Sequence, residues 1–238
     1  MRALRIVLVI VIVLAGLFVA ADRVAVNMAE DEVAKKLMTE LEVPSDGDAS
    51  VSIDGFPFLT QVASKDLDSV EAELSGITAE AGGRQVTLTE VKLSGSDVHL
   101  SDGYSSAVAS KATGTVHISY ADLSRAADEG VRVGYGGKDK SGRGQVKVTA
   151  AVTVPMVGKT LERSVYSSVT VEGGDTVRLH ADKVPGSRIP GVEDAIRKKI
   201  DFDRKISQLP DGLKLKKVVT TETGIDVSIS GTDVNLAG

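Results

Sequence analysis

Apolar and polar residues alternate along most of the chain beyond residue 50, and this period of two constrains the fold more than any other feature. The clearest run extends from Val146 to Met156, where six apolar residues occupy every second position. Such alternation is typical of β-strands that bury one face and expose the other. Gly-rich turn signals separate the runs, so consecutive strands are expected to pair antiparallel. Val91 and Leu93 fall on the opposite parity to Val86 and Leu88, which predicts a bulge near Glu90.

Three stretches have a helical period instead. Residues 22–41 place apolar residues on one stripe, a second helix is expected at about residues 120–128, and a third begins after Pro190. The chain therefore predicts an α+β protein in which a few helices cover one apolar face of a large antiparallel sheet. That inner face is mostly Val, Ala, Leu and Ile. It can form a packed core or line a cavity for an aliphatic chain, and both interpretations stay open.

The N-terminus indicates a compartment. Arg2 and Arg5 precede an uncharged, almost wholly apolar segment of 16 residues, Ile6 to Ala21. As a helix it reaches ~24 Å, slightly short of a bilayer core of about 30 Å, and Val19-Ala20-Ala21 offers small residues to a signal peptidase. We expect residues 1–21 to be a signal peptide or an N-terminal membrane anchor. Residues 22–238 are then one extracytoplasmic domain of the cell envelope, either anchored or secreted.

The composition excludes several kinds of chemistry. The chain has no Cys, which excludes disulfides, thiolate metal sites and Cys nucleophiles. It has no Trp and only 3% aromatic residues, so stacking platforms for bases or sugars are not expected. The formal net charge of −5 gives no general support for binding nucleic acid.

Few residue groupings could carry catalysis. His99, His117 and His180 each stand between two apolar residues of an alternating run, so each is expected to point to water. The Gly-rich stretch 134–144 lies between two strands, which favours a hairpin over a phosphate loop. Acidic residues at 66, 68, 71 and 73 indicate a solvated strand face rather than a carboxylate pair of a lipid or glycan hydrolase. We therefore expect no enzyme, no cofactor and no metal.

Basic residues gather in the last quarter of the chain. The clusters are Arg197-Lys198-Lys199, Arg204-Lys205 and Lys214-Lys216-Lys217. A solvated face is one interpretation of these charges. The other is a patch that meets anionic lipid headgroups, where each Lys or Arg contributes about 1 kcal/mol.

One segment departs from the alternation. Residues 53–61 contain two of the four Phe residues, Phe56 and Phe58, on either side of Pro57. Burial of one Phe contributes about 1.5–3 kcal/mol, so both rings are expected inside the protein or at an apolar interface. The segment is either a core plug where the strand turns or the mouth of an apolar cavity.

Three sequence blocks resemble a known family. They are GFPFLTQ at Gly55–Gln61 followed by Asp68–Glu71, then VHISYADL at Val116–Leu123, and finally Leu209–Leu215 leading into Glu222–Val227. In this order they resemble the LmeA-like family of actinobacterial cell-envelope proteins. The resemblance implies phospholipid binding connected with lipoglycan maturation. It also implies a tubular lipid-binding (TULIP-like) fold, in which a curved antiparallel sheet wraps around a long N-terminal helix.

From these observations we expect an exported, membrane-associated protein that holds acyl chains of a phospholipid in an apolar groove. The expected lipid is anionic, and the expected place is the outer face of the cytoplasmic membrane. Phe56, Pro57, Phe58 and Leu59 are the residues expected at the groove. The alternative is a non-catalytic envelope scaffold or interaction domain with a solid core.

Overall fold

The computed structural model describes residues 2–81, 83–101, 103–104, 106–153, 160–183, 197, 201–206 and 209–237. The helices are α1 (Arg2–Glu40), α2 (Phe58–Ser64) and α3 (Tyr120–Ala126). The strands are β1 (Asp48–Asp54), β2 (Asp66–Ala81), β3 (Arg84–Leu100), β4 (Ala107–Ser119), β5 (Val131–Lys138), β6 (Gly144–Thr153), β7 (Thr160–Glu172), β8 (Thr176–Lys183), β9 (Phe202–Lys205), β10 (Leu213–Thr220) and β11 (Gly224–Ala237).

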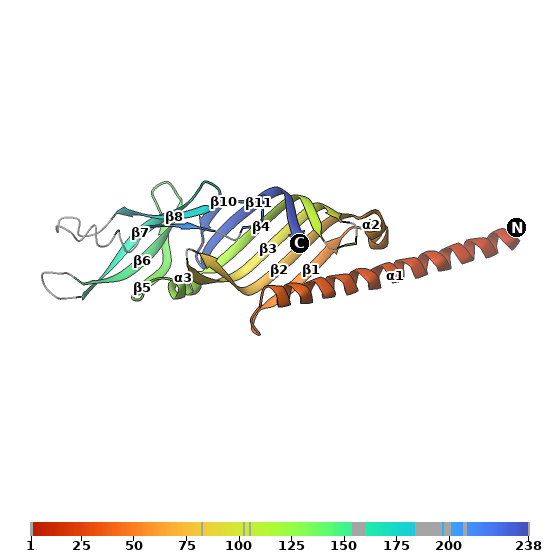
Figure 1. Cartoon of the computed structure of the whole chain (residues 1–238), viewed down its shortest axis with the longest axis horizontal. Coiled ribbons are helices and arrows are strands. Elements are labelled where there is room, and N and C mark those ends of the chain that lie inside the picture. Colours follow the sequence, from red (N-terminus) through yellow and green to blue (C-terminus); the bar gives the residue numbers. More distant parts are fainter. Residues whose placement is uncertain are drawn as a thin grey trace.

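The fold is α+β, with a long N-terminal helix packed on a large, open antiparallel sheet, as expected (Figure 1). The strands form two sheets rather than one. A six-stranded sheet has the order β1-β2-β3-β4-β11-β10, and a five-stranded sheet has the order β5-β6-β7-β8-β9. The division arises because β4 leads into α3 and pairs with β11 instead of β5.

Helix α1 is a single helix of 39 residues in which the apolar segment continues directly into the predicted amphipathic helix. Its C-terminal half packs on the six-stranded sheet, with Val26 buried against β2–β4 and Leu37 and Met38 against β1–β3. The carboxylate of Glu30 accepts a 2.8 Å hydrogen bond from the backbone N–H of Ile53 on the edge strand β1. By length and composition helix α1 can cross a membrane, and its most apolar stretch is not buried in the protein.

The residues of β3 that face the core do not keep to every second position along the whole strand. Leu88 and Val91 contact the same cluster although they are three residues apart, so the predicted parity change holds for Val91, whereas Leu93 is exposed. The predicted bulge near Glu90 is wrong, because the β2–β3 register passes this point without a shift. Gly76 in this part of β2 takes a φ of +69°, a conformation that favours glycine.

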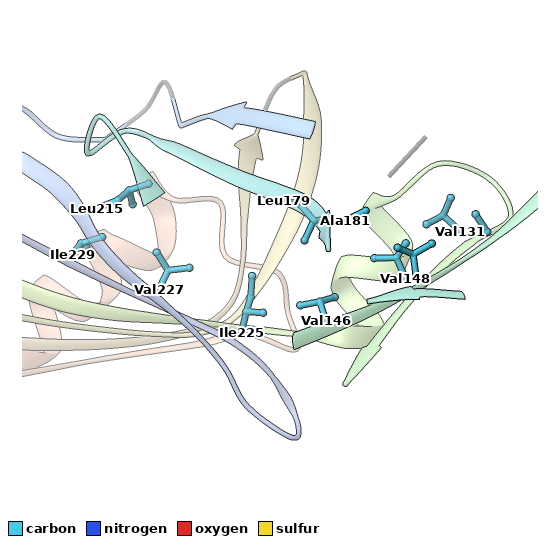
Figure 2. Close-up of a cluster of buried hydrophobic side chains, with 11 residues drawn as sticks. Val131, Val146, Val148, Leu179, Ala181, Leu215, Ile225, Val227 and Ile229 are labelled. Carbon is cyan, nitrogen blue, oxygen red and sulfur yellow. The ribbon is translucent and has the colours of Figure 1, made fainter. Parts of the chain in front are cut away.

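The largest apolar cluster joins the two sheets. Its buried residues come from β5–β8 and from β10 and β11, and Figure 2 shows them as an elongated band. Val146 of β6 and Val165 of β7 are almost completely inaccessible at its centre. The backbone N–H of Leu215 donates a 2.7 Å hydrogen bond to the carbonyl of Gly174, so the sheets also meet through the main chain.

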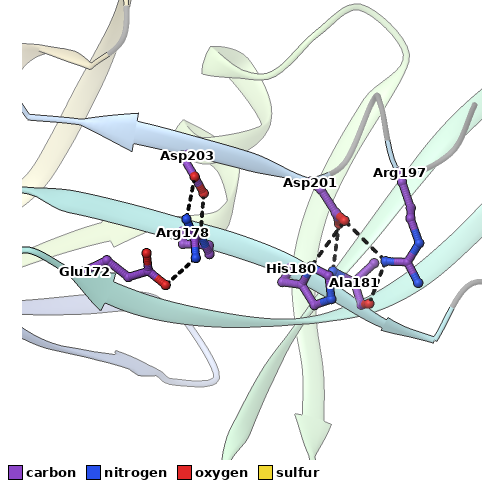
Figure 3. Close-up of polar contacts among 7 residues, drawn as sticks. All are labelled: Glu172, Arg178, His180, Ala181, Arg197, Asp201 and Asp203. Carbon is purple, nitrogen blue, oxygen red and sulfur yellow. Dashed lines mark hydrogen bonds and ion pairs between the residues drawn. The ribbon is translucent and has the colours of Figure 1, made fainter. Parts of the chain in front are cut away.

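Ion pairs hold the edge strand β9 against β8 (Figure 3). Arg178 donates two hydrogen bonds to Asp203, of 2.7 and 2.8 Å, and a further one to Glu172. Asp201 accepts from the backbone N–H of Ala181 at 2.8 Å and pairs with Arg197 at 3.2 Å. These contacts satisfy polar groups at the end of the five-stranded sheet.

Other predicted elements are also found. The helix expected at 120–128 is α3, and the Gly-rich stretch 134–144 is part of the β5–β6 hairpin. In that hairpin Asp139 accepts bonds from the side chain and backbone of Ser141 and from the backbone of Arg143, which lower its pKa to about 2. The acidic residues of β2 are exposed, as predicted. Val154, Met156 and the helix expected after Pro190, Arg197 excepted, lie outside the described residues.

Candidate functional site: an apolar face and the segment at its helix-exit end

The turn before α2 has a backbone shape that only glycine fits. Gly55 has a φ of +100°, a region that side chains rarely allow. A Cβ on Gly55 would lie 2.4 Å from both Asp68 Oδ2 and Gln61 Nε2. The Phe56–Pro57 peptide bond that follows is cis.

Gln61 ties this turn to the start of β2. Its side chain is nearly buried, and its Oε1 accepts a 2.7 Å hydrogen bond from the backbone N–H of Asp68. Its Nε2 donates to the carbonyl of Asp54 at 3.3 Å. Gly55, Gln61 and Asp68 all belong to the first sequence block, so this part of the motif shapes the turn.

The two phenylalanines of the segment point to different environments. Phe58 is only 7% exposed and packs with Val26, Leu67 and Val98, so it is a core residue. Phe56 is 57% exposed, and the Arg23 guanidinium lies 5.2 Å from its ring centroid in a cation–π contact. Pro57 is half-buried and Leu59 is 37% exposed. The plug interpretation therefore holds for Phe58, while Phe56 and Leu59 form an exposed apolar tip.

Asp22 is the residue that fixes this tip to α1, and sequence reasoning missed it. Its side chain is fully buried, and its carboxylate accepts hydrogen bonds from the Leu59 backbone N–H at 2.8 Å and from Arg23 at 2.7 Å. Burial opposes ionisation, but these hydrogen bonds outweigh it and hold the pKa of Asp22 below its usual value. A lone acid directly after a long apolar run was the only signal in the sequence.

Three apolar clusters form one continuous surface, which we call the apolar face. Leu213 contacts both the cluster between the sheets and the one under α1, and Val116 links the cluster between the sheets to the one at β1–β3. The face therefore extends from α2 to the five-stranded sheet. Several members are only half-buried, among them Val133, Val169, Val171, Val177 and Val218. The protein's own side chains thus cover the face incompletely.

The total accessible surface is large for the mass of the chain. It is 14679 Å² for a chain of 24.8 kDa. A compact monomer of that mass exposes about 10,000 Å². The exposed apolar residues in the N-terminal half of α1 contribute to the excess.

One polar atom lies on the apolar face. Ser167 of β7 is fully buried on the same strand side as Val165 and Val169. Within the described residues its hydroxyl has no hydrogen-bond partner. A buried hydroxyl without a partner costs about 1–3 kcal/mol, so a ligand atom that accepts its hydrogen would be favoured here.

Two surface depressions are lined mostly by polar and charged residues. One, of about 380 Å³, includes His117, whose Nδ1 lies 2.6 Å from Asp226 Oδ1, together with Glu90 and Lys92. The other, of about 250 Å³, includes His180, 3.3 Å from Asp201. His99 and His180 are exposed, as predicted, whereas His117 is partly covered. Within the described part of the chain, no three His, Asp or Glu side chains meet as metal ligands.

The second sequence block has a structural role. Ser119 caps α3: its Oγ accepts from the Asp122 N–H at 3.1 Å and donates to the Asp122 carboxylate at 2.5 Å. Thr89 on β3 donates to the same carboxylate at 2.8 Å. The Tyr120 hydroxyl donates to the Thr221 carbonyl at 2.7 Å. These bonds join β3, α3 and the turn before β11 where the two sheets meet.

The fold and the face define an α+β protein that packs an open antiparallel sheet on a long helix and leaves an apolar surface partly uncovered. The family model for LmeA-like phospholipid-binding proteins matches residues 20–230, and the chain belongs to this family. All three sequence blocks lie inside the matched range. Comparison with curated proteins and with solved structures gave no match.

Proposed function

We propose that the protein is an extracytoplasmic, membrane-associated phospholipid-binding protein that holds acyl chains along the apolar face. The observation that carries the proposal is the continuity of this face across both sheets together with its incomplete cover. Each methylene that an acyl chain buries there contributes about 0.8 kcal/mol. Binding of a whole chain therefore requires no covalent step, and the protein acts by binding rather than by catalysis.

Polar groups near the face suit the remainder of a phospholipid. The Ser167 hydroxyl can donate to an ester carbonyl of the lipid. Lys214, Lys216 and Lys217 of β10 are exposed, while Leu215 between them is buried in the cluster joining the sheets. These lysines favour an anionic headgroup. A contribution of the bound lipid to envelope lipid or lipoglycan maturation is supported by the family resemblance alone.

Adjacent positions on β7 provide a test. Val169 belongs to the apolar face, and Thr170 next to it is exposed. We expect Val169→Gln to reduce the phospholipid that remains with the purified full chain, because an amide then meets the acyl chain. Thr170→Gln introduces the same side chain on the exposed side of the same strand. This variant should therefore retain as much phospholipid as the wild type.

Extraction with organic solvent followed by quantitative mass spectrometry measures the retained lipid. Lipid around α1 is common to all three proteins, so only the difference between variants reports on the apolar face. Equal retention in both variants and the wild type, with all three folded by circular dichroism, would leave a scaffold with a closed core as the better account.

A further inference from the structure

The position of the exposed tip relative to α1 carries an inference about orientation. Helix α1 is unbroken, so its apolar half has a fixed direction relative to the body. Figure 1 shows that half projecting past the end of the body that carries α2, with the five-stranded sheet at the opposite end. A membrane that receives the apolar segment therefore lies next to the α2 end.

The hydrogen bond between Asp22 and Leu59 fixes the position of the tip along α1, next to the end of the apolar segment. Asp22 directly follows the apolar segment that ends at Ala21, and the 2.8 Å bond brings the first turn of α2 to the same level. A charged residue cannot enter the hydrocarbon core cheaply, so Asp22 and Arg23 mark the boundary of the spanning segment. The tip thus lies where the helix leaves the bilayer.

The residues at this level are suited to the bilayer interface. Phe56 is 57% exposed, Leu59 is 37% exposed, and Tyr104, whose hydroxyl reaches the Val62 carbonyl on α2, is 57% exposed. Tyr side chains such as Tyr104 gather at the headgroup level of membranes, where one part of the ring is apolar and the other wet, and the apolar Phe56 and Leu59 side chains can enter the lipid beside it. Arg23 over the Phe56 ring places a cation at the same depth, next to lipid phosphates.

We infer that the α2 end docks on the membrane surface, with Phe56 and Leu59 inserted in the lipid interface beside the exit of α1. The occupant of this patch is the bilayer that holds the apolar half of α1, because the hydrogen bond from Leu59 to Asp22 fixes the exposed tip beside the end of that apolar segment. The docked protein stands on the membrane with its apolar face running away from it. This orientation does not depend on whether a lipid occupies that face.

The absence of Trp from the chain allows a sharp test. In the full chain, Phe56→Trp or Leu59→Trp introduces a single Trp at the tip, which is excited selectively over the four Tyr. Tyr166→Trp, on an exposed position of β7 in the far sheet, is the matched control. Each protein is reconstituted into vesicles of phosphatidylcholine and phosphatidylglycerol, with or without bromine on the acyl chains.

We expect blue-shifted emission and several-fold stronger quenching by brominated lipid for the two tip variants than for Tyr166→Trp. The soluble quencher acrylamide should rank them in the reverse order. Tip emission as red-shifted and unquenched as that of the control would overturn the inference. Blue-shifted emission without quenching by brominated lipid would also overturn it, because a protein surface would then cover the tip. Lipid retention at Val169 is a separate measurement, so the two proposals can fail independently.

Discussion

The carboxylate of Asp22 accepts a 2.8 Å hydrogen bond from the backbone N–H of Leu59, 37 residues further along the chain. This bond joins the end of the apolar segment to the first turn of α2. It also satisfies an N–H group that the start of the helix leaves unpaired, and a carboxylate there is favoured by the helix dipole. The exposed tip thereby has a defined position beside α1.

Removal of this carboxylate should loosen the start of α2. We expect amide hydrogen exchange at Leu59 to be fastest in Asp22→Ala, intermediate in Asp22→Asn, which keeps an acceptor oxygen, and slowest in the wild type. Because folding lowers the pKa of Asp22, its contribution is present above the ordinary value of 3.8 and is lost as the pH falls through the folded value. Equal protection in all three proteins would contradict this role.

The cap of α3 should contribute measurably to stability. Ser119→Ala removes the hydroxyl that accepts from the Asp122 N–H and donates to its carboxylate. Loss of an N-cap costs about 1 kcal/mol in the free energy of unfolding. Denaturant unfolding of all the proteins in the same detergent measures this free energy. The control is Ser52→Ala at an exposed position of β1, which should change the free energy of unfolding little. A change in the free energy of unfolding no larger than that of the control would contradict a stabilising role for the Ser119 cap.

Ser167 should show opposite effects with and without lipid. In the lipid-free protein, Ser167→Ala removes a buried hydroxyl that lacks a partner among the described residues, so stability should rise by about 1 kcal/mol. Phospholipid affinity should fall several-fold, because the hydrogen bond that we propose from Ser167 to the lipid ester would be lost. Thermal unfolding and a vesicle-binding titration measure the two effects. Destabilisation of the lipid-free variant would show that the hydroxyl has a protein partner.

Tyr120 should be the tyrosine that ionises at unusually high pH. Burial raises its pKa to about 12, with smaller contributions from Tyr135 and Asp226. The pKa of Tyr120 in the folded protein lies above the ordinary value of 10.0. The contribution of the neutral Tyr120 side chain to the free energy of unfolding is therefore complete below pH 10.0 and is lost as the pH rises through about 12. The chain has four Tyr and no Trp, which makes phenolate absorbance a clean measure. The step near pH 12 should be missing in Tyr120→Phe, and its persistence there would reject the assignment.

The alternation predicted the strands well because it reports which side of each strand is buried. The run beginning at Val146 is β6, and Val146, Val148 and Ala150 are buried as expected. Alternation carries no information on which strands pair. It therefore did not predict the division into two sheets, nor the junction where Leu215 bonds to Gly174.

The candidate site was predicted only in part. Helix α2 has seven residues, too few to show a helical period in the sequence. Apolar character alone predicted one environment for Phe56 and Phe58, but the second begins α2 and enters the core while the first stays outside. The contact of Asp22 with Leu59 depends on the packing of α1 against α2, which a local pattern does not encode.

The central claim is that an acyl chain lies on the apolar face, and photo-crosslinking tests it most directly. The full chain is incubated in vesicles that contain a phospholipid with a diazirine on its acyl chain, irradiated, digested and mapped by mass spectrometry. We predict adducts on peptides of β7, β8 and β10, which carry the half-buried Val171, Val177 and Val218 of the apolar face, in addition to those on the apolar half of α1. Adducts confined to α1 and the tip would contradict the claim.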